Sequence, residues 1–361
     1  MCGFGANTLI KAGYSVNERT QGRSALLLTD SSFMKKDEVD SQWDTIFNNA
    51  KENRSATTEF ILLGFGNLHE LQLLPFVTVL FIYMIAISGN MLVLIIVLAD
   101  RSLHTPMYFF LGNLSILEIC YISTIVPKML RTFLTEHEVI SLMGCITQLY
   151  VFGSLGISEC LLLSVMSFDW YLAICHPLNY SAIMNFKACL LLAAGSWATG
   201  FMVPVISIVM VFRLPFFISN VIDHFFCDLM PLLKLLCTGA YKIEVVTFTF
   251  AACVVVVPCL LTLVSYYRII LTISRIPSTT GKKKAFSTCS SHLLIVSIFY
   301  GALIIIYGFP IGNQSPGLNK VFSVLYTVLT PTVNPLIYSL RNKEVKDALR
   351  RIAMKAIAFR S

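Results

Sequence analysis

Charged residues are scarce in this sequence. Asp, Glu, Lys and Arg make up 13% of its 361 residues, whereas a soluble domain carries roughly 25%. Hydrophobic residues make up 56% of the chain, so much of it cannot face water. Basic repeats and the Cys–His spacings of metal sites are also missing. These absences argue against nucleic acid as a partner. They also argue against an enzyme, which would need metal ligands or a nucleophile–base set.

Long apolar runs take the place of the missing charge. Seven stretches reach the roughly 20 residues that a helix needs to cross a bilayer. Lipid satisfies no backbone polar groups, so these spans must be helices. The sequence therefore predicts an all-α membrane protein, a bundle of seven transmembrane helices. The predicted spans are 73–98, 106–126, 145–168, 188–212, 245–267, 286–309 and 321–340.

Lys and Arg predict the orientation in the membrane. Fourteen lie in alternate connections and the C-terminal tail, against six on the other side when the N-terminal tail is left out. The C-terminus is therefore expected in the cytosol and the N-terminus outside the cell. Residues 1–72 are predicted to form a mostly disordered extracellular tail without a signal peptide, and 73–340 the transmembrane domain. Residues 341–361 are predicted to form an amphipathic helix and tail whose basic side chains meet lipid headgroups.

Five strings carry a family resemblance. They are "TEFILLGF" at 58–65, "LHTPMYFFLGNLS" at 103–115, "SFDWYLAICHPLNY" at 167–180, "KAFSTCSSHL" at 284–293 and "NPLIYSLRNKEVKDAL" at 334–349. In their order and their place at the membrane boundaries they closely resemble the olfactory receptors, a branch of the rhodopsin-like G-protein-coupled receptors. The resemblance implies a plasma-membrane receptor, not an enzyme, that binds small, mainly apolar volatile molecules. Binding would activate a stimulatory olfactory G protein and raise cyclic AMP.

The resemblance also implies a mainly apolar ligand pocket in the outer half of the bundle. Gly153 and Gly156 would leave room there for a ligand or for close helix contact. A hydroxyl of Tyr307 or Thr327 would meet one polar group of the ligand, although plain packing explains each position equally well. The expected ligand contacts are Phe152, Gly153, Gly156, Ile157, Cys160, Phe250, Val254, Leu303, Ile304, Tyr307, Val324 and Thr327.

Four polar residues, Asn90, Glu118, Glu159 and Asn334, lie inside predicted spans. An acid within the hydrocarbon is costly and marks function by default. The resemblance implies a polar core that rearranges on activation and that holds a sodium ion in related receptors. Glu118 and Glu159 could flank one cation or share one proton. The alternative is a protonated, hydrogen-bonded pair that only packs helices, and no other cofactor is expected.

Trp170 departs from the family pattern. Asp169, Trp170 and Tyr171 stand where the family has acid, arginine and tyrosine, and Trp has neither the charge nor the donor fork of Arg. Three interpretations stay open: a receptor that binds odorant but signals weakly or not at all, a decayed receptor gene product, and a harmless interfacial Trp. The resemblance assigns activation and G-protein coupling to Asp169, Trp170, Tyr171, Tyr266, Tyr300, Asn334, Pro335 and Tyr338.

The outer side carries three further expectations. The resemblance implies a disulfide between Cys145 and Cys227. A second bridge of the family would lack one partner here, because Phe217 stands at the place of a cysteine and leaves Cys237 unpaired. Asn53 opens an Asn-Arg-Ser glycosylation acceptor. A small-solute transporter is the rival class, but internal repeats and helices broken near the midplane are missing.

Overall fold

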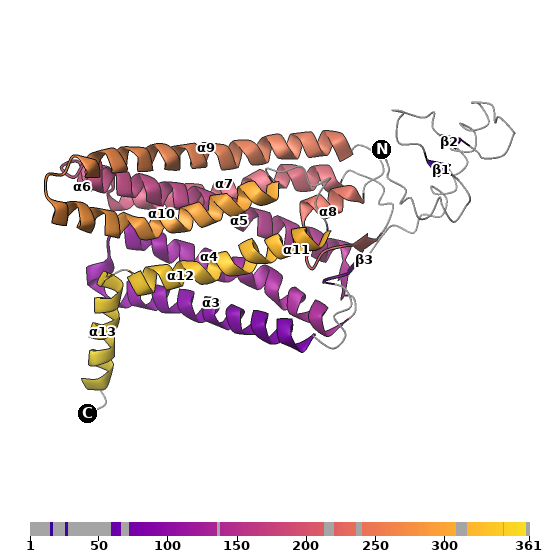
Figure 1. Ribbon diagram of the computed structural model, residues 1–361, viewed down its shortest axis with the longest axis horizontal. Coiled ribbons are helices and arrows are strands. Elements are labelled where there is room, and N and C mark those ends of the chain that lie inside the picture. The colour runs from indigo at the N-terminus through magenta and orange to yellow at the C-terminus, as the bar shows by residue number, and fades with distance from the viewer. Residues whose placement is uncertain are drawn as a thin grey trace.

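The fold is a bundle of long helices that run side by side (Figure 1). The computed structural model describes residues 15–16, 26–27, 59–65, 72–135, 138–212, 220–235, 240–307, 316–341 and 343–358. The bundle helices in these ranges are α3 (Leu73–Ala99), α4 (Pro106–Leu134), α5 (Leu142–Cys175), α7 (Phe186–Phe212), α9 (Ala240–Ser274) and α10 (Thr279–Tyr307). The seventh consists of α11 (Pro316–Val324), the π-helical turn η4 (Leu325–Leu329) and α12 (Thr330–Arg341).

Helix length and composition agree with a membrane bundle. Within the described residues, α3, α4, α5, Phe186–Met210 of α7 and Ala252–Ser274 of α9 are each long and apolar enough to cross a membrane. In α10 the apolar stretch is shorter and runs from Cys289 to Ile304. The helices continue past the predicted spans, because polar residues outside hydrocarbon can remain helical. The predicted seven-helix membrane fold is confirmed.

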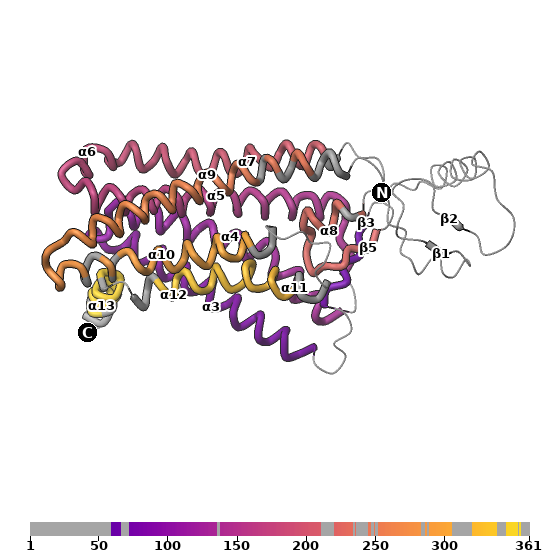
Figure 2. Tube along the Cα trace, turned by 45° about the horizontal axis from the view of Figure 1, so that its top comes forward, coloured from indigo at the N-terminus to yellow at the C-terminus, as the bar shows by residue number. Residues whose placement is uncertain are grey.

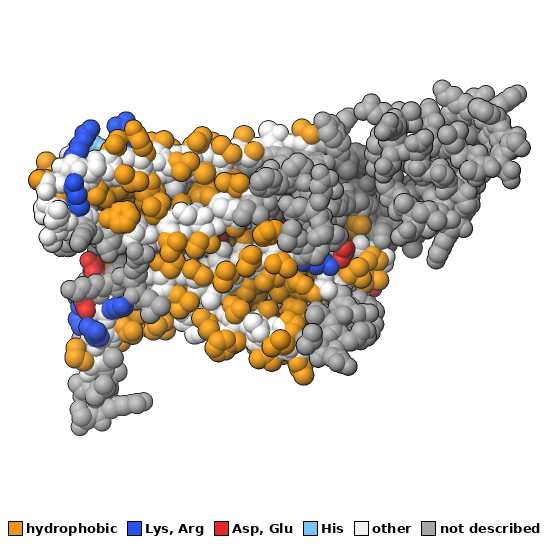
Figure 3. All heavy atoms as spheres, in the orientation of Figure 1, with side chains coloured by type: hydrophobic (Ala, Val, Ile, Leu, Met, Phe, Trp, Pro, Cys, Tyr) orange, Lys and Arg blue, Asp and Glu red, His pale blue; other side chains and the backbone are white. Residues whose placement is uncertain are grey.

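Apolar side chains cover the outside of the bundle as well as its core. Phe81, Leu98 and Leu191 are each about two-thirds exposed or more, which suits contact with lipid rather than water. On the face drawn in Figure 3, hydrophobic side chains cover the middle of the bundle, and many charged ones gather near the end where α13 lies. Helix α5 packs against α4, α7 and α9, so residues on its different faces can reach several neighbours (Figure 2).

One end of the bundle, called the α13 end here, is marked by α13 (Lys343–Ala358), which lies across the helix ends (Figure 1). The short elements η2 (Arg101–Leu103) and α6 (Tyr180–Ile183) also lie at this end. Arg351 of α13 donates to Asp100 at 2.9 Å and to Ser102 at 2.8 Å. Hydrogen bonds from Ser102 and Arg351 lower the pKa of Asp100 to about 2, so this carboxylate stays charged at neutral pH.

The opposite end, called the sheet end, carries a three-stranded sheet in the order β4 (Glu138–Ser141), β3 (Glu59–Leu62), β5 (Val221–Ile222). Strand β3 is antiparallel to β4 and parallel to β5. Phe60 and Leu62 of β3 are fully buried against Cys145 and Cys227. The "TEFILLGF" string thus forms a central strand within a tail predicted to be mostly disordered. Short helix α8 (Leu229–Lys234) follows β5, and a separate pair, β1 (Ser15–Val16) with β2 (Leu26–Leu27), precedes the sheet.

Gly64 ends the central strand with a backbone that only glycine adopts readily. Its φ is +58°, in the left-handed region. A Cβ added there would lie 2.9 Å from Cβ of Thr132 on α4, which is closer than such atoms approach. The absence of a side chain at Gly64 therefore lets the chain after β3 lie directly on α4.

Replacing Phe60 by alanine tests the importance of this strand. We expect Phe60→Ala to lower the free energy of unfolding by about 3–5 kcal/mol, because it leaves a cavity in a fully buried cluster. Thermal unfolding of the purified receptor measures the loss. Glu59→Ala is the matched control, since Glu59 is the exposed neighbour on the same strand. Equal melting temperatures for the two variants would show that the strand does not stabilise the bundle.

Candidate functional site

An aromatic cluster forms around Phe152, one of the predicted ligand contacts on α5. The ring centroid of Phe152 lies 5.1 Å from that of Tyr121 on α4, 5.1 Å from that of Phe226 and 6.1 Å from that of Tyr326 in η4. Phe226 belongs to the segment after β5, so this loop reaches into the helix bundle. These rings bring three helices and one loop together on the sheet-end side of the core.

A second group of predicted residues meets two turns further along α5. The Sγ atom of Cys160 lies 3.4 Å from the hydroxyl of Tyr300 on α10 and 3.8 Å from the carbonyl of Val254 on α9. Thr327 in η4 is fully buried and donates its hydroxyl to the carbonyl of Ser323 at 2.6 Å. Its hydroxyl can therefore still accept a hydrogen bond, but its one donor is already engaged.

Other predicted contacts lie elsewhere. A Cβ at Gly153 would meet Pro204 of α7 at 4.0 Å, and one at Gly156 would meet Tyr121 at 3.9 Å, so a methyl group at either position would make only ordinary van der Waals contact. Ile304 is 58% exposed and does not join the group. Ile157, Leu303 and Val324 are partly buried. The side chains of Phe250 and Tyr307 lie outside the described residues.

The loop that carries Phe226 is fixed at the sheet end. Cys145 at the start of α5 and Cys227 form a disulfide with their Cα atoms 5.4 Å apart, which confirms that prediction. The Nε2 atom of His224 lies 3.3 Å from the hydroxyl of Ser323. Burial, and the charge of Lys320, lower the pKa of His224 to about 3, so the ring stays neutral. Cys237, Phe217 and Asn53 lie outside the described residues.

The four predicted polar residues are all buried inside the bundle. Asn90 donates to the carbonyls of Ala86 and Pro331, each at 3.1 Å, and so links α3 to α12. Asn334 donates to Oε1 of Glu118. Among the described residues, Oε2 of Glu118 and Oε1 of Glu159 have no hydrogen-bond partner. Buried polar oxygens usually have a partner, and a proton or a cation could supply it here.

Trp170 lies in an apolar cluster at the α13 end of the core. It packs with Tyr266, Ile269 and Ile273 of α9 and with Cys289 of α10. Its Nε1 atom is buried and has no hydrogen-bond partner among the described residues. Tyr266, to which the resemblance assigns a role in activation, bonds to Nδ1 of His292 at 2.6 Å. The indole therefore joins α5 to two other helices through apolar contact alone.

Asp169 has a tyrosine as its hydrogen-bond partner. Its side chain is buried, and Oδ1 accepts a hydrogen bond from the hydroxyl of Tyr180 at 2.8 Å. Burial and the Asp169 carboxylate raise the pKa of Tyr180, so the phenol stays protonated and donates. Tyr171 turns to His176, 2.9 Å away. Tyr171 also packs against the same apolar cluster as Trp170, so only Asp169 stands apart from that cluster.

The remaining predicted activation residues lie where helices approach closely. Pro335 is inside α12, and a Cβ added at Gly89 of α3 would lie 3.1 Å from its Cγ atom. Tyr300 meets Cys160 as described above. The backbone of Tyr338 belongs to α12, but its side chain lies outside the described residues. The predicted set therefore extends from the middle of the bundle, where Tyr300 meets Cys160, to the α13 end.

The seven-helix bundle with its buried polar core defines a G-protein-coupled receptor. The family model for olfactory receptors matches residues 79–356. Human olfactory receptor 10A5 is 49% identical over 310 residues, 86% of this chain and 98% of the relative. Human olfactory receptor 10A2 is 50% identical over 81% of this chain and 96% of the relative, and mouse olfactory receptor 5G9 is 46% identical over 86% and 99%.

The chain belongs to the olfactory receptor family. It is therefore a multi-pass receptor of the plasma membrane, in a family whose members bind small molecules and couple to G proteins.

Sequence reasoning missed four residues that the structure brings into these sites. They are Tyr180, His292, His224 and Gln148, which accepts a hydrogen bond from the backbone N–H of Cys227 at 3.0 Å. Tyr180 and His292 lie within strings that carry the resemblance, so the sequence did indicate that these segments matter. Their partners could not be predicted, because they lie on other helices or loops.

The Tyr180 hydrogen bond can be removed without changing the shape of the side chain. We expect Tyr180→Phe to lower the free energy of unfolding by about 1.5–3 kcal/mol, because it leaves a buried carboxylate without its described donor. Thermal unfolding in detergent measures this loss. Tyr171→Phe, which removes an exposed hydrogen bond of similar length, should cost less. A larger loss for Tyr171→Phe would contradict the assignment of Tyr180 as the partner of Asp169.

Proposed function

We propose that this chain is an odorant receptor for small, mainly apolar volatile molecules whose coupling to a stimulatory G protein is weakened by Trp170. The observation that carries this proposal is the packing of the indole against α9 and α10. In the proposed orientation the α13 end faces the cytosol. The excess of Lys and Arg there and the disulfide at the opposite end support that orientation.

The residues around Phe152 and Cys160 support the proposed class of ligand. In the contacts described above, the partners of Phe152, Cys160 and Thr327 are aromatic rings, a hydroxyl group and backbone carbonyls, and none of these partners is charged. Apolar surface gives most of the binding energy for a small ligand, while a few polar groups fix its orientation. Since the hydroxyl of Thr327 can only accept, it would suit the hydroxyl of an alcohol better than the carbonyl of an ester.

Weak coupling follows from the contacts of Trp170. An arginine at this position keeps its charge and presents several donors. The indole has one donor, and here that donor is buried in an apolar cluster. Odorant binding can favour an active arrangement only by differential affinity for it. In this proposal the Trp170 cluster stabilises the resting arrangement of the α13 end, so the active arrangement becomes higher in free energy relative to it. The active arrangement also lacks the charged contact that an arginine would make.

Replacing Trp170 by arginine tests the proposal. We expect Trp170→Arg to increase the odorant-stimulated cyclic AMP response by about tenfold at equal surface expression, which corresponds to a shift of about 1.4 kcal/mol. Trp170→Phe is the matched control: it shortens the apolar side chain without adding charge and should give a much smaller gain. The odorant panel and expression level are the same for all three proteins. Equal responses from all three would overturn the proposal of weakened coupling.

We infer further that Glu118 and Glu159 hold one neutralising charge between them, either a monovalent cation or a shared proton. Their unpaired oxygens and the Asn334 amide support this inference. A cation at this site would be held by the two carboxylates and would stabilise the resting arrangement of the helices. A proton would do the same by removing the repulsion between two buried negative charges.

Ion exchange tests this inference. We expect the melting temperature of the purified receptor to rise either when choline is replaced by sodium or when the pH is lowered from 8 to 6, because each neutralises the pair. Glu159→Gln should remove whichever response is found, since it leaves a single acid. Asp347→Asn, on exposed helix α13, controls for general charge effects. A wild-type receptor that responds to neither condition would contradict the inference.

A further inference from the structure

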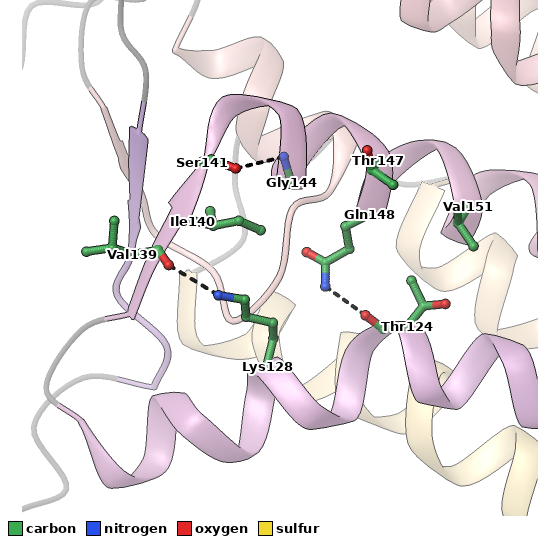
Figure 4. A pocket seen from close by; sticks show the side chains of 9 residues that line it. All are labelled: Thr124, Lys128, Val139, Ile140, Ser141, Gly144, Thr147, Gln148 and Val151. Atoms are coloured by element: carbon green, nitrogen blue, oxygen red, sulfur yellow. Dashed lines mark hydrogen bonds between the residues drawn. The ribbon is translucent and has the colours of Figure 1, made fainter.

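A cavity of about 440 Å³ lies at the sheet end, between α4, α5 and strand β4. Figure 4 shows Thr124 and Lys128 on α4 facing Thr147, Gln148 and Val151 on α5, with Val139, Ile140 and Ser141 beside them. The volume lies within the range of small-molecule sites, about 300–1,000 Å³. None of the residues expected to contact odorant lines this cavity. It is therefore a separate place in the fold, and the proposed odorant function does not account for it.

The charge beside the cavity is positive. Nζ of Lys128 lies 2.8 Å from Oε1 of Glu138, and Nε of Arg131 lies 3.2 Å from the same oxygen. Two cations thus meet one carboxylate among the described residues, which leaves one positive charge in excess. The Glu138 side chain is 6% exposed, whereas that of Lys128 is 30% exposed. The excess charge is therefore accessible at the cavity wall rather than enclosed with its partner.

The polar groups of the wall have donors to spare. Lys128 carries three N–H donors, and two have partners among the described residues, namely Glu138 and the carbonyl of Val139 at 3.2 Å. One N–H of Gln148 donates to the carbonyl of Thr124 at 2.9 Å, which leaves the second amide hydrogen. The first turn of α5 also borders the cavity and contains no acid. A ligand with negatively charged acceptor atoms suits this wall.

The other wall is apolar. Ile140 and Val151 contribute aliphatic side chains to the cavity, whereas Val139 turns its side chain away and presents its carbonyl to Lys128 (Figure 4). Ile140 is buried and Val151 is partly buried, so this apolar surface lies inside the cavity. Lysine near the end of a membrane helix extends its charge towards the headgroup region. A ligand with an anionic head and a hydrocarbon tail could thus place its head beside Lys128 and its tail against the aliphatic wall.

We propose that this cavity binds an aliphatic carboxylate, with its head on Lys128 and its tail along Ile140 and Val151. A carboxylate matches the single excess charge and the two remaining donors, and a flexible alkyl chain matches the aliphatic wall. Burial of each further methylene is favourable, so a longer chain should bind more tightly until it leaves the cavity. The proposal concerns binding alone and holds whether or not the receptor couples to a G protein.

Occupancy of this cavity should influence the odorant site through Gln148. Besides its bond to Thr124, Gln148 accepts from the backbone N–H of Cys227 at 3.0 Å. Cys227 is held by the disulfide, and its neighbour Phe226 contacts Phe152. A carboxylate that hydrogen-bonds to Gln148 would therefore act one residue away from an aromatic ring of the odorant cluster.

Equilibrium dialysis of radiolabelled octanoate against receptor in zwitterionic nanodiscs tests the proposal, with empty nanodiscs as the blank. We expect saturable binding of octanoate and at least tenfold weaker binding of methyl octanoate, which has the same tail without the charge. Equal affinity for the acid and the ester would overturn the proposal. Octanoate can also be offered to nanodiscs that contain oleate. Displacement by oleate identifies acids held in the membrane as the occupant, and undiminished binding identifies short acids from water.

Two variants locate the bound octanoate. The first combines Lys128→Gln with Glu138→Gln: it removes the ligand's counterion and does not leave Glu138 as a buried carboxylate without that lysine. The second, Thr147→Phe, fills the cavity from an exposed position. We expect each to weaken octanoate binding at least tenfold while the melting temperature stays within a few degrees. Arg268→Gln, which removes one exposed charge at the other end of the bundle, should bind as wild type. If both cavity variants bind octanoate as tightly as wild type, the acid binds elsewhere and the proposal is wrong.

Discussion

The bilayer's lack of hydrogen-bond partners is the constraint on which the rest of this structure depends. It forces the apolar runs into helices, and it leaves exposed aliphatic side chains such as Leu98 facing lipid. It also means that polar groups inside the bundle must find partners on neighbouring helices. Asn90 and Asn334 do so through α12 and Glu118. The unpaired oxygens of the two glutamates are the places where this requirement is not met by described residues, and they mark the core as a candidate for change on activation.

Helix α5 connects the separate sites. Along its length it carries the disulfide cysteine, the central phenylalanine of the aromatic cluster, the buried Glu159 and finally Asp169 and Trp170. A ligand near Phe152 therefore contacts the same rigid element that ends in the Trp170 cluster. This is a physical route between the two ends, because a helix transmits rotation and translation along its axis. In the proposal, coupling to the G protein is limited at the α13 end of that route, where apolar packing replaces a mobile charged contact.

The sequence predicted those features that depend on composition and on residues close in the chain. The seven spans follow from apolar runs, and the Cys145–Cys227 disulfide follows from the family resemblance. Features that depend on contacts between distant segments were not predicted. Strand β3 lies in a short apolar stretch whose partners, β4 and β5, come from two different loops. The Tyr180–Asp169 hydrogen bond joins residues that are 11 apart in the chain, but it depends on how α6 lies against α5. The cavity beside Lys128 arises only when α4, α5 and β4 pack together.

Weak coupling requires that the Trp170 indole N–H stays buried between α5, α9 and α10 when odorant binds. The most direct measurement is nuclear magnetic resonance of the tryptophan indole N–H groups in ¹⁵N-labelled receptor, which contains three tryptophans. Loss of one signal in Trp170→Phe assigns the resonance. We expect this signal to exchange slowly with deuterated water and to keep its position when odorant is added. Rapid exchange, or a new resonance position at saturating odorant, would show that the indole leaves the cluster.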